Sequence, residues 1–160
     1  PGGATVNLYL VRHGRATTVK ADPTRPLTAR GRAEMARVAN FLKRLGLRVD
    51  AIWHSDLARA AESARIIAPA VRSREGLVER KDLREQSPIR PIRKEIARLD
   101  GGLMIVGHLP FLGELAVRLV AGRKSLDMLV FPRGAVVCLV RDADLAWRVC
   151  WAIDPGLIPS

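Results

Sequence analysis

Residues 5–14, TVNLYLVRHG, decide how the rest of the sequence is read. Residues 5–11 form a nearly continuous, β-prone apolar run that stops at Arg12-His13-Gly14. Such a run is typical of a buried strand, and the glycine predicts a tight turn directly after it. In open parallel sheets the ligand crevice lies beyond the carboxyl ends of the strands. Arg12 and His13 are therefore expected beside a ligand site.

Helical periodicities and short apolar runs alternate after this first strand. Thr28 is placed as the N-cap of an amphipathic helix that ends at Gly46, and Asp56 as the cap of a second helix that ends near Pro69. A third helical stretch runs from about residue 91 to 99, and a fourth from Pro110 to Val120. Short strands are expected at residues 51–53, 77–78 and 103–106.

The last two apolar runs, residues 135–140 and 147–153, flank the polar segment RDAD at 141–144, which is typical of a hairpin. Strand and helix alternate four times before this hairpin. The pattern predicts an α/β fold, a three-layer sandwich whose central sheet is mostly parallel with an antiparallel C-terminal edge hairpin. A length of 160 residues favours a single domain over residues 1–160.

Composition narrows the class of protein. The net charge of +11 suits an anionic ligand, but the arginines are scattered and aromatic residues make up only 4%, which disfavours a nucleic-acid partner. No apolar run approaches the roughly 20 residues that cross a bilayer, so no membrane partner is expected. Cys138 and Cys150 are interpreted as reduced core residues of a cytoplasmic protein.

Chemistry-bearing residues gather at the predicted strand ends. Arg12 and His13 follow the first strand, Arg59 lies in the first helical turn after the second, and His108 follows the strand at 103–106. Two imidazoles, two guanidiniums and nearby helix N-termini suit a phosphate dianion. Histidine can also act as the nucleophile in phosphoryl transfer, and Gly14 would let the backbone approach the ligand.

Four blocks in this order resemble the histidine phosphatase (phosphoglycerate mutase-like) superfamily, and especially its short SixA-type phosphohistidine phosphatases. The resemblance spans nearly the whole chain, and each block lies at a predicted strand end or helix start. The blocks are LVRHG at 10–14, RPLT at 25–28 with Gly31, SDLARA at 55–60 with ESA at 62–64, and VGHLP at 106–110.

The resemblance implies a role for each matching residue. His13 would be the phosphorylated nucleophile, and Arg12, Arg59 and His108 would bind and stabilise the transferring phosphoryl group, joined by Arg25. The segment LREQSP at 83–88 resembles the family's Leu-x-Glu segment, which makes Glu85 the candidate general acid. Asp82 is its rival for that role.

Two departures from the family pattern bear on the substrate. Arg15 stands where relatives usually carry an acidic residue, which adds positive charge beside the pocket. Only 48 residues separate Arg59 from His108, too few for the helical lid of the family's mutases, so an open site is expected.

The sequence therefore predicts a hydrolase that needs neither cofactor nor metal and forms a covalent phosphohistidine on His13. No glycine-rich nucleotide loop or closely spaced ligand set appears. The expected substrate is a phosphohistidine protein. Two alternatives stay open: a phosphatase for small phosphate esters, and a non-catalytic phosphate- or RNA-binding module favoured by the basic charge.

Overall fold

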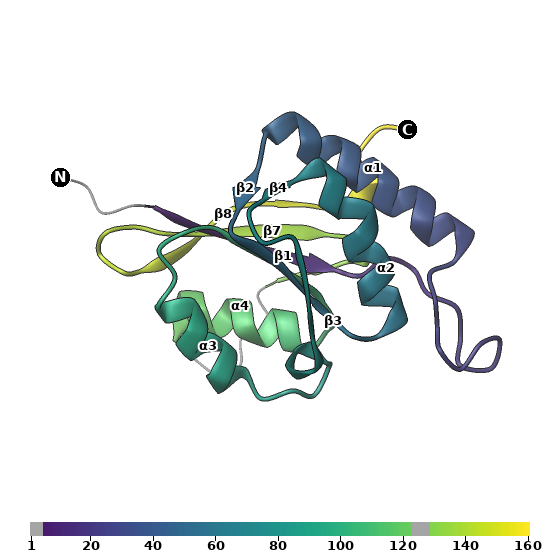
Figure 1. The fold of residues 1–160 in the computed structure, drawn as a ribbon, viewed down its shortest axis with the longest axis horizontal. Coiled ribbons are helices and arrows are strands. Elements are labelled where there is room, and N and C mark those ends of the chain that lie inside the picture. Colours follow the sequence, from purple (N-terminus) through teal and green to yellow (C-terminus); the bar gives the residue numbers. More distant parts are fainter. Residues whose placement is uncertain (1–4, 123–128) are drawn as a thin grey trace.

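The computed structural model describes residues 5–122 and 129–160. Its centre is a six-stranded sheet in the order β5-β3-β6-β1-β7-β8, and strands β2 and β4 form a separate parallel pair (Figure 1). The strands are β1 (Val6–Arg12), β2 (Arg48–Val49), β3 (Ala51–Ser55), β4 (Arg72–Ser73), β5 (Leu77–Arg80), β6 (Leu103–Gly107), β7 (Val136–Arg141) and β8 (Trp147–Ile153).

Strand directions agree with the mixed sheet predicted from the sequence. β1 pairs with β6, β6 with β3 and β3 with β5, all in parallel. β7 is antiparallel to β1, and β8 is antiparallel to β7. The prediction of a mostly parallel sheet with an antiparallel C-terminal edge hairpin is confirmed. The pair β2–β4 was not predicted, since two-residue strands leave no periodicity to recognise.

Helices cover both faces of the sheet, which gives the three predicted layers (Figure 1). α1 and α2 contribute Met35, Val38, Leu42 and Ile67 to one apolar cluster, while α3 and α4 contribute Ile92, Ile96, Phe111 and Leu115 to the other. The helices are α1 (Ala29–Leu45), α2 (Ala58–Ile67), α3 (Ile89–Ala97) and α4 (Phe111–Ala121), and short 3-10 helices span Ala68–Ala70, Lys81–Leu83 and Pro155–Leu157.

Helix caps show where local sequence rules hold and where tertiary contacts override them. Thr28 accepts a hydrogen bond from the Gly31 amide and Gly46 ends α1 in the left-handed conformation, so both predicted caps of α1 are confirmed. The predicted Asp56 cap of α2 is wrong. The N-cap is Leu57, and the Asp56 carboxylate instead accepts two hydrogen bonds from Arg84, at 2.8 and 2.5 Å.

The two cysteines are free thiols in the C-terminal hairpin. Cys138 is buried, as predicted for a core residue, but Cys150 is exposed, so that prediction is wrong for Cys150. Cys138 pairs with Trp151, and the register of the hairpin shifts between Cys138 and Leu139. Within the described residues, no helix is long and apolar enough to cross a membrane. That residues 1–160 form one domain remains a prediction, since residues 1–4 and 123–128 lie outside the described part.

Candidate active site

Two imidazoles lie side by side where adjacent parallel strands end. His13 follows β1 and His108 follows β6, and the His13 amide donates to the Gly107 carbonyl at 3.0 Å. Their ring centroids are 5.0 Å apart, with planes inclined by 57°. The sheet thus unites residues that are far apart in sequence, as expected at the carboxyl edge of a parallel sheet.

The His13 ring has one defined tautomer. Nδ1 lies 2.7 Å from the Gly14 carbonyl oxygen. A carbonyl can only accept, so Nδ1 carries the hydrogen and Nε2 keeps its lone pair. Among the residues that the structure describes, Nε2 has no hydrogen-bond partner. The neutral ring therefore presents a free nitrogen nucleophile.

Burial and positive neighbours keep both imidazoles neutral. Desolvation lowers the pKa of His13 to about 3, and the charges of His108, Arg59 and Arg12 add to this, opposed by the Gly14 hydrogen bond. The pKa of His108 falls to about 4, mainly through desolvation and then the charge of Arg59, with Arg25 and Arg12 contributing and Asp56 opposing. At neutral pH the site offers uncharged imidazoles between guanidinium groups.

Ser55, the last residue of β3, fixes the orientation of His108. Its Oγ lies 2.8 Å from Nε2 of His108. Neutral His108 can accept a hydrogen bond from this hydroxyl at Nε2, and its Nδ1 then carries the hydrogen. Nδ1 of His108 faces the site and has no hydrogen-bond partner among the described groups. The nearest acid to that nitrogen is Glu85, at 3.8 Å. His108 can then donate Nδ1–H to an anion.

Arg59 and Glu85 form an ion pair at the same place. The Arg59 side chain is buried, and its Nη2 donates to Oε1 of Glu85 at 2.6 Å. Its Nε is also buried and has no hydrogen-bond partner among the described residues. Glu85 is still 43% exposed, which leaves its carboxylate free to swing away. A phosphate that enters would compete with Glu85 for the Arg59 guanidinium.

A buried serine connects Arg59 to the loop after His13. Ser63, one turn further along α2, accepts from the Gly14 amide at 3.0 Å and donates to the Arg59 carbonyl at 2.7 Å. The backbone beside His13 is held from the other side by Gly134, whose amide lies 3.0 Å from the Arg12 carbonyl and 3.1 Å from that of His13. The position of His13 is therefore set by α2 and by the segment before β7.

The remaining predicted arginines reach the site from its rim. Arg12 donates from Nη1 to the Phe131 carbonyl at 2.9 Å, and its Nε is buried with no partner in residues 5–122 and 129–160. Arg25 takes a left-handed backbone conformation, with φ of 49°, and donates from Nε to the Thr17 carbonyl at 3.0 Å. Its charge contributes to the low pKa of His108, so it belongs to the same electrostatic environment.

Geometry separates the two rival acids. Asp82 accepts two hydrogen bonds from Arg80, at 2.9 and 2.6 Å, and Arg80 also holds Glu95. This pairing lowers the pKa of Asp82 and directs its carboxylate to the Arg80 ion-pair cluster. Glu85 alone of the two contacts Arg59 and His108.

Packing against α1 requires a residue without a side chain at Gly14. A Cβ on Gly14 would lie 2.8 Å from Cγ of Met35 and 3.2 Å from the Gly31 carbonyl, both in α1. Its missing side chain therefore lets the His13 loop pack on α1, and close approach of the Gly14 backbone to a ligand stays a prediction. The third histidine, His54, is buried, and its Nδ1 is bonded to the Ser55 carbonyl at 2.9 Å.

Sequence reasoning missed the roles of Ser55 and Ser63. Both lie inside motif blocks, but their partners come from other strands and loops, and only the fold brings these together. In the described part of the chain, no group of three or more His, Cys, Asp or Glu side chains is placed to hold a metal ion.

Comparison with known families identifies this arrangement. The profile of the histidine phosphatase superfamily (branch 1) matches residues 8–88, just over half of the chain. The chain belongs to the histidine phosphatase superfamily. Its sequence is 34% identical over 126 residues to an uncharacterised protein of the cyanobacterium Picosynechococcus, covering 74% of this chain and 75% of that protein.

Two further relatives bear on the family membership. The mitochondrial serine/threonine-protein phosphatase Pgam5 of Drosophila ananassae is 37% identical over 87 residues, which are 53% of this chain and 30% of that protein. The protein histidine phosphatase SixA, solved with tungstate, superposes with a TM-score of 0.83 at 20% identity, covering 96% of this chain and 99% of SixA. The fold is that of SixA-type histidine phosphatases, and family and fold together support a phosphatase.

Proposed function

We propose that this chain is a phosphohistidine phosphatase that transfers the phosphoryl group of a phosphoprotein to His13 and then to water. The observation that carries the proposal is the hydrogen bond from Nδ1 of His13 to the Gly14 carbonyl, at 2.7 Å. It leaves Nε2 unprotonated, and the low pKa of about 3 keeps it so throughout the neutral range. Histidine in this form is a competent nucleophile.

In the first step the lone pair of Nε2 attacks phosphorus in line with the leaving group. A bond from phosphorus to Nε2 forms, and the phosphorus–nitrogen bond of the substrate breaks, its electron pair leaving on the substrate imidazole. Arg12, Arg59 and the Nδ1–H of His108 hold the equatorial oxygens. The phosphorylated His13 ring becomes positively charged, and the Gly14 carbonyl accepts its Nδ1–H, which stabilises that charge.

Glu85 is the proposed proton donor to the leaving group. Phosphate would displace it from Arg59, to which it is bound at 2.6 Å, while keeping it next to His108. Once released from Arg59, Glu85 takes up a proton from solvent and passes it to the departing imidazole nitrogen. In the second step water attacks phosphorus, the bond to Nε2 breaks, and Glu85 takes a proton from that water. Inorganic phosphate leaves, Glu85 releases that proton to solvent and pairs again with Arg59, and the starting forms of His13 and Glu85 return.

Three observations support a phosphoprotein substrate. The fold superposes along almost its full length on a protein histidine phosphatase, and the Pgam5 relative is a protein phosphatase. Between Arg59 and His108, the rest of α2 is followed by one further α-helix, α3, which packs against α4. Glu85 at the rim is 43% exposed, which suits the approach of a side chain carried on a protein surface.

The test is a substrate panel in EDTA. Wild-type protein is given a histidine-phosphotransfer domain phosphorylated on histidine, a phosphoserine peptide and glucose 6-phosphate at equal concentrations. We expect the phosphohistidine protein to have the highest kcat/KM. Rapid hydrolysis of glucose 6-phosphate with an untouched phosphohistidine protein would establish a small-molecule phosphatase instead. RNA binding that falls steeply with salt, without any hydrolysis, would establish a binding module.

A further inference from the structure

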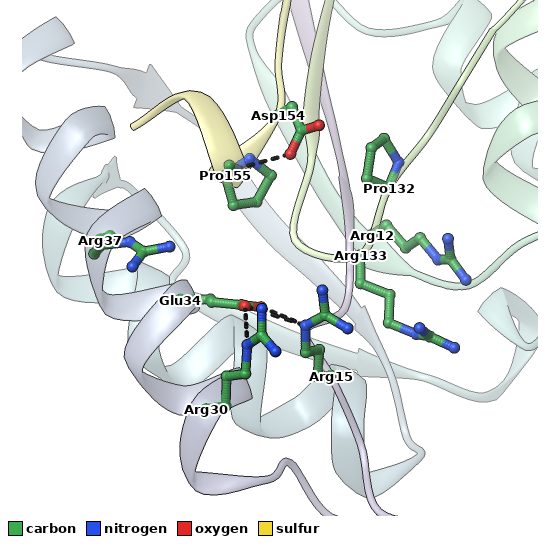
Figure 2. A pocket seen from close by; sticks show the side chains of 10 residues that line it. Arg12, Arg15, Arg30, Glu34, Arg37, Pro132, Arg133, Asp154 and Pro155 are labelled. Carbon is green, nitrogen blue, oxygen red and sulfur yellow. Dashed lines mark hydrogen bonds and ion pairs between the residues drawn. The ribbon is translucent and has the colours of Figure 1, made fainter. Parts of the chain in front are cut away.

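A second basic cleft opens beside the catalytic residues. It has a volume of about 370 Å³ and is lined by five arginines and two acidic residues (Figure 2). Arg30 and Arg37 lie in the first half of α1 and Arg15 in the loop before it. Arg12 and Arg133 lie together on the opposite wall (Figure 2). The acidic residues are Glu34 and Asp154.

The acidic residues leave much of this positive charge uncompensated. Glu34 is buried and is bound by Arg15, at 3.1 Å to each oxygen, and by Arg30, at 3.0 Å. Asp154 accepts a hydrogen bond from the Gly156 amide at 2.8 Å. The Nε groups of Arg12 and Arg37 are buried and have no partner among the described residues. Buried donors of this kind are costly unless a ligand accepts from them.

Arg12 joins the cleft to the catalytic site. It lines the cleft, and its charge contributes to the low pKa of His13. Burial and then the charge of Arg133 lower the pKa of Arg12 itself, because the two guanidiniums lie on the same wall of the cleft and repel each other. An anion between them would remove this repulsion.

We propose that this cleft binds a second anionic group of the substrate, a carboxylate or a phosphate, while the phosphoryl group lies at His13. The inference rests on the proposed phosphatase function and specifies its substrate class. The lining has no aromatic ring on which a base could stack, and its uncharged side chains are prolines. The cleft therefore selects for negative charge, which guanidinium groups bind in bidentate fashion.

The charge has two possible sources, which matched substrates distinguish. One pair consists of phosphohistidine peptides with glutamates or glutamines next to the phosphorylated residue. The other pair is glucose 1,6-bisphosphate and glucose 6-phosphate. We expect the extra anion to lower KM in at least one pair. A gain in the peptide pair assigns the cleft to acidic protein side chains, and a gain in the sugar pair assigns it to a second phosphate.

Variants link the preference to the cleft. In Arg30→Gln/Arg37→Gln, Arg15 still pairs with Glu34, so the helix keeps its buried ion pair. In this double variant, the kcat/KM of the substrate with the extra anion, divided by that of the matched substrate without it, should fall about tenfold or more. The reason is that the extra anion loses its charge-assisted hydrogen bonds. Arg37→Gln alone should show part of this loss. Arg44→Gln, an exposed residue in the last turn of α1, is the control and should leave the ratio unchanged.

A binding measurement separates this inference from the proposed function. Isothermal titration calorimetry at constant ionic strength compares inorganic tripolyphosphate with orthophosphate, and needs no turnover. Tighter binding of tripolyphosphate to wild type, lost in Arg30→Gln/Arg37→Gln, supports the second subsite even if no substrate is hydrolysed. The second subsite would be overturned if tripolyphosphate bound wild type and the double variant with equal affinity. It would also be overturned if the enzyme hydrolysed both substrates of each pair without preferring the one with the extra anion.

Discussion

Ser63→Ala should damage both stability and catalysis, although Ser63 touches no substrate in the proposed mechanism. Its hydroxyl is buried between the Gly14 amide, at 3.0 Å, and the Arg59 carbonyl, at 2.7 Å. The variant leaves the Gly14 amide buried without an acceptor, which costs about 1–3 kcal/mol. For a domain of this size, a loss of 2 kcal/mol lowers Tm by about 4–8 °C.

Catalysis should fall because Gly14 directly follows His13, the proposed nucleophile. A loosened Gly14 lets the His13 carbonyl and ring shift, and small misplacements of a reacting group are costly. We expect kcat for an aryl phosphate to fall roughly tenfold, corresponding to about 1.4 kcal/mol, with a smaller change in KM. Urea denaturation and steady-state kinetics measure the two effects.

Ser73→Ala provides the matched control for this prediction. Ser73 also accepts a backbone hydrogen bond, from Gly76 at 3.0 Å, but it is half-buried in β4, so water can replace the hydroxyl. It should lose less than about 1 kcal/mol and keep its kcat. If Ser63→Ala equals wild type in both stability and kcat, the reasoning about the buried relay is refuted.

Further predictions concern the acid and the pH dependence. Glu85→Gln should lower kcat for an aryl phosphate about a hundredfold, because Glu85 is the proposed proton donor beside Arg59. Asp82 is bound to Arg80, so Asp82→Asn should lower stability and leave kcat near that of wild type. The opposite pattern would make Asp82 the acid. The pKa values of His13 and His108 are lower in the folded protein than in the unfolded chain. Between pH 6.5 and about 4, these histidines therefore bind protons in the unfolded chain but not in the folded protein, so the free energy of unfolding should fall as pH falls. From pH 7 to 5 each histidine accounts for up to about 2 kcal/mol, measurable by urea denaturation. Imidazole NMR signals of these two residues that titrate near pH 6.5 would show this explanation to be wrong.

The sequence predicts the layered fold well because apolar runs and caps are local signals. The strand before His13, the caps Thr28 and Gly46, and the C-terminal hairpin all follow from short-range rules and are confirmed. Asp56 shows the limit of such rules. Its carboxylate is a good cap in isolation, but Arg84, 28 residues away, offers two charged hydrogen bonds.

The site is predictable where it lies on strand ends and not where it depends on packing. Motif blocks place His13, Arg59 and His108 at one edge of the sheet, and the structure brings them together with Glu85. The functions of Ser55 and Ser63 depend on partners from other elements, which no spacing along the chain encodes. The same holds for Gly14, whose need is set by the contact with Met35.

The most direct test of the central claim is to trap the phosphorylated protein. Wild type and His13→Ala are mixed with an aryl phosphate in EDTA, quenched at alkaline pH, digested and analysed by mass spectrometry, with His54→Ala as the second histidine variant. The account predicts one phosphoryl group on the peptide of wild type that contains His13. His13→Ala should lose both this phosphoryl group and the activity, whereas His54→Ala should still form it. Full activity in His13→Ala, or a phosphoryl group trapped on another residue, would contradict it.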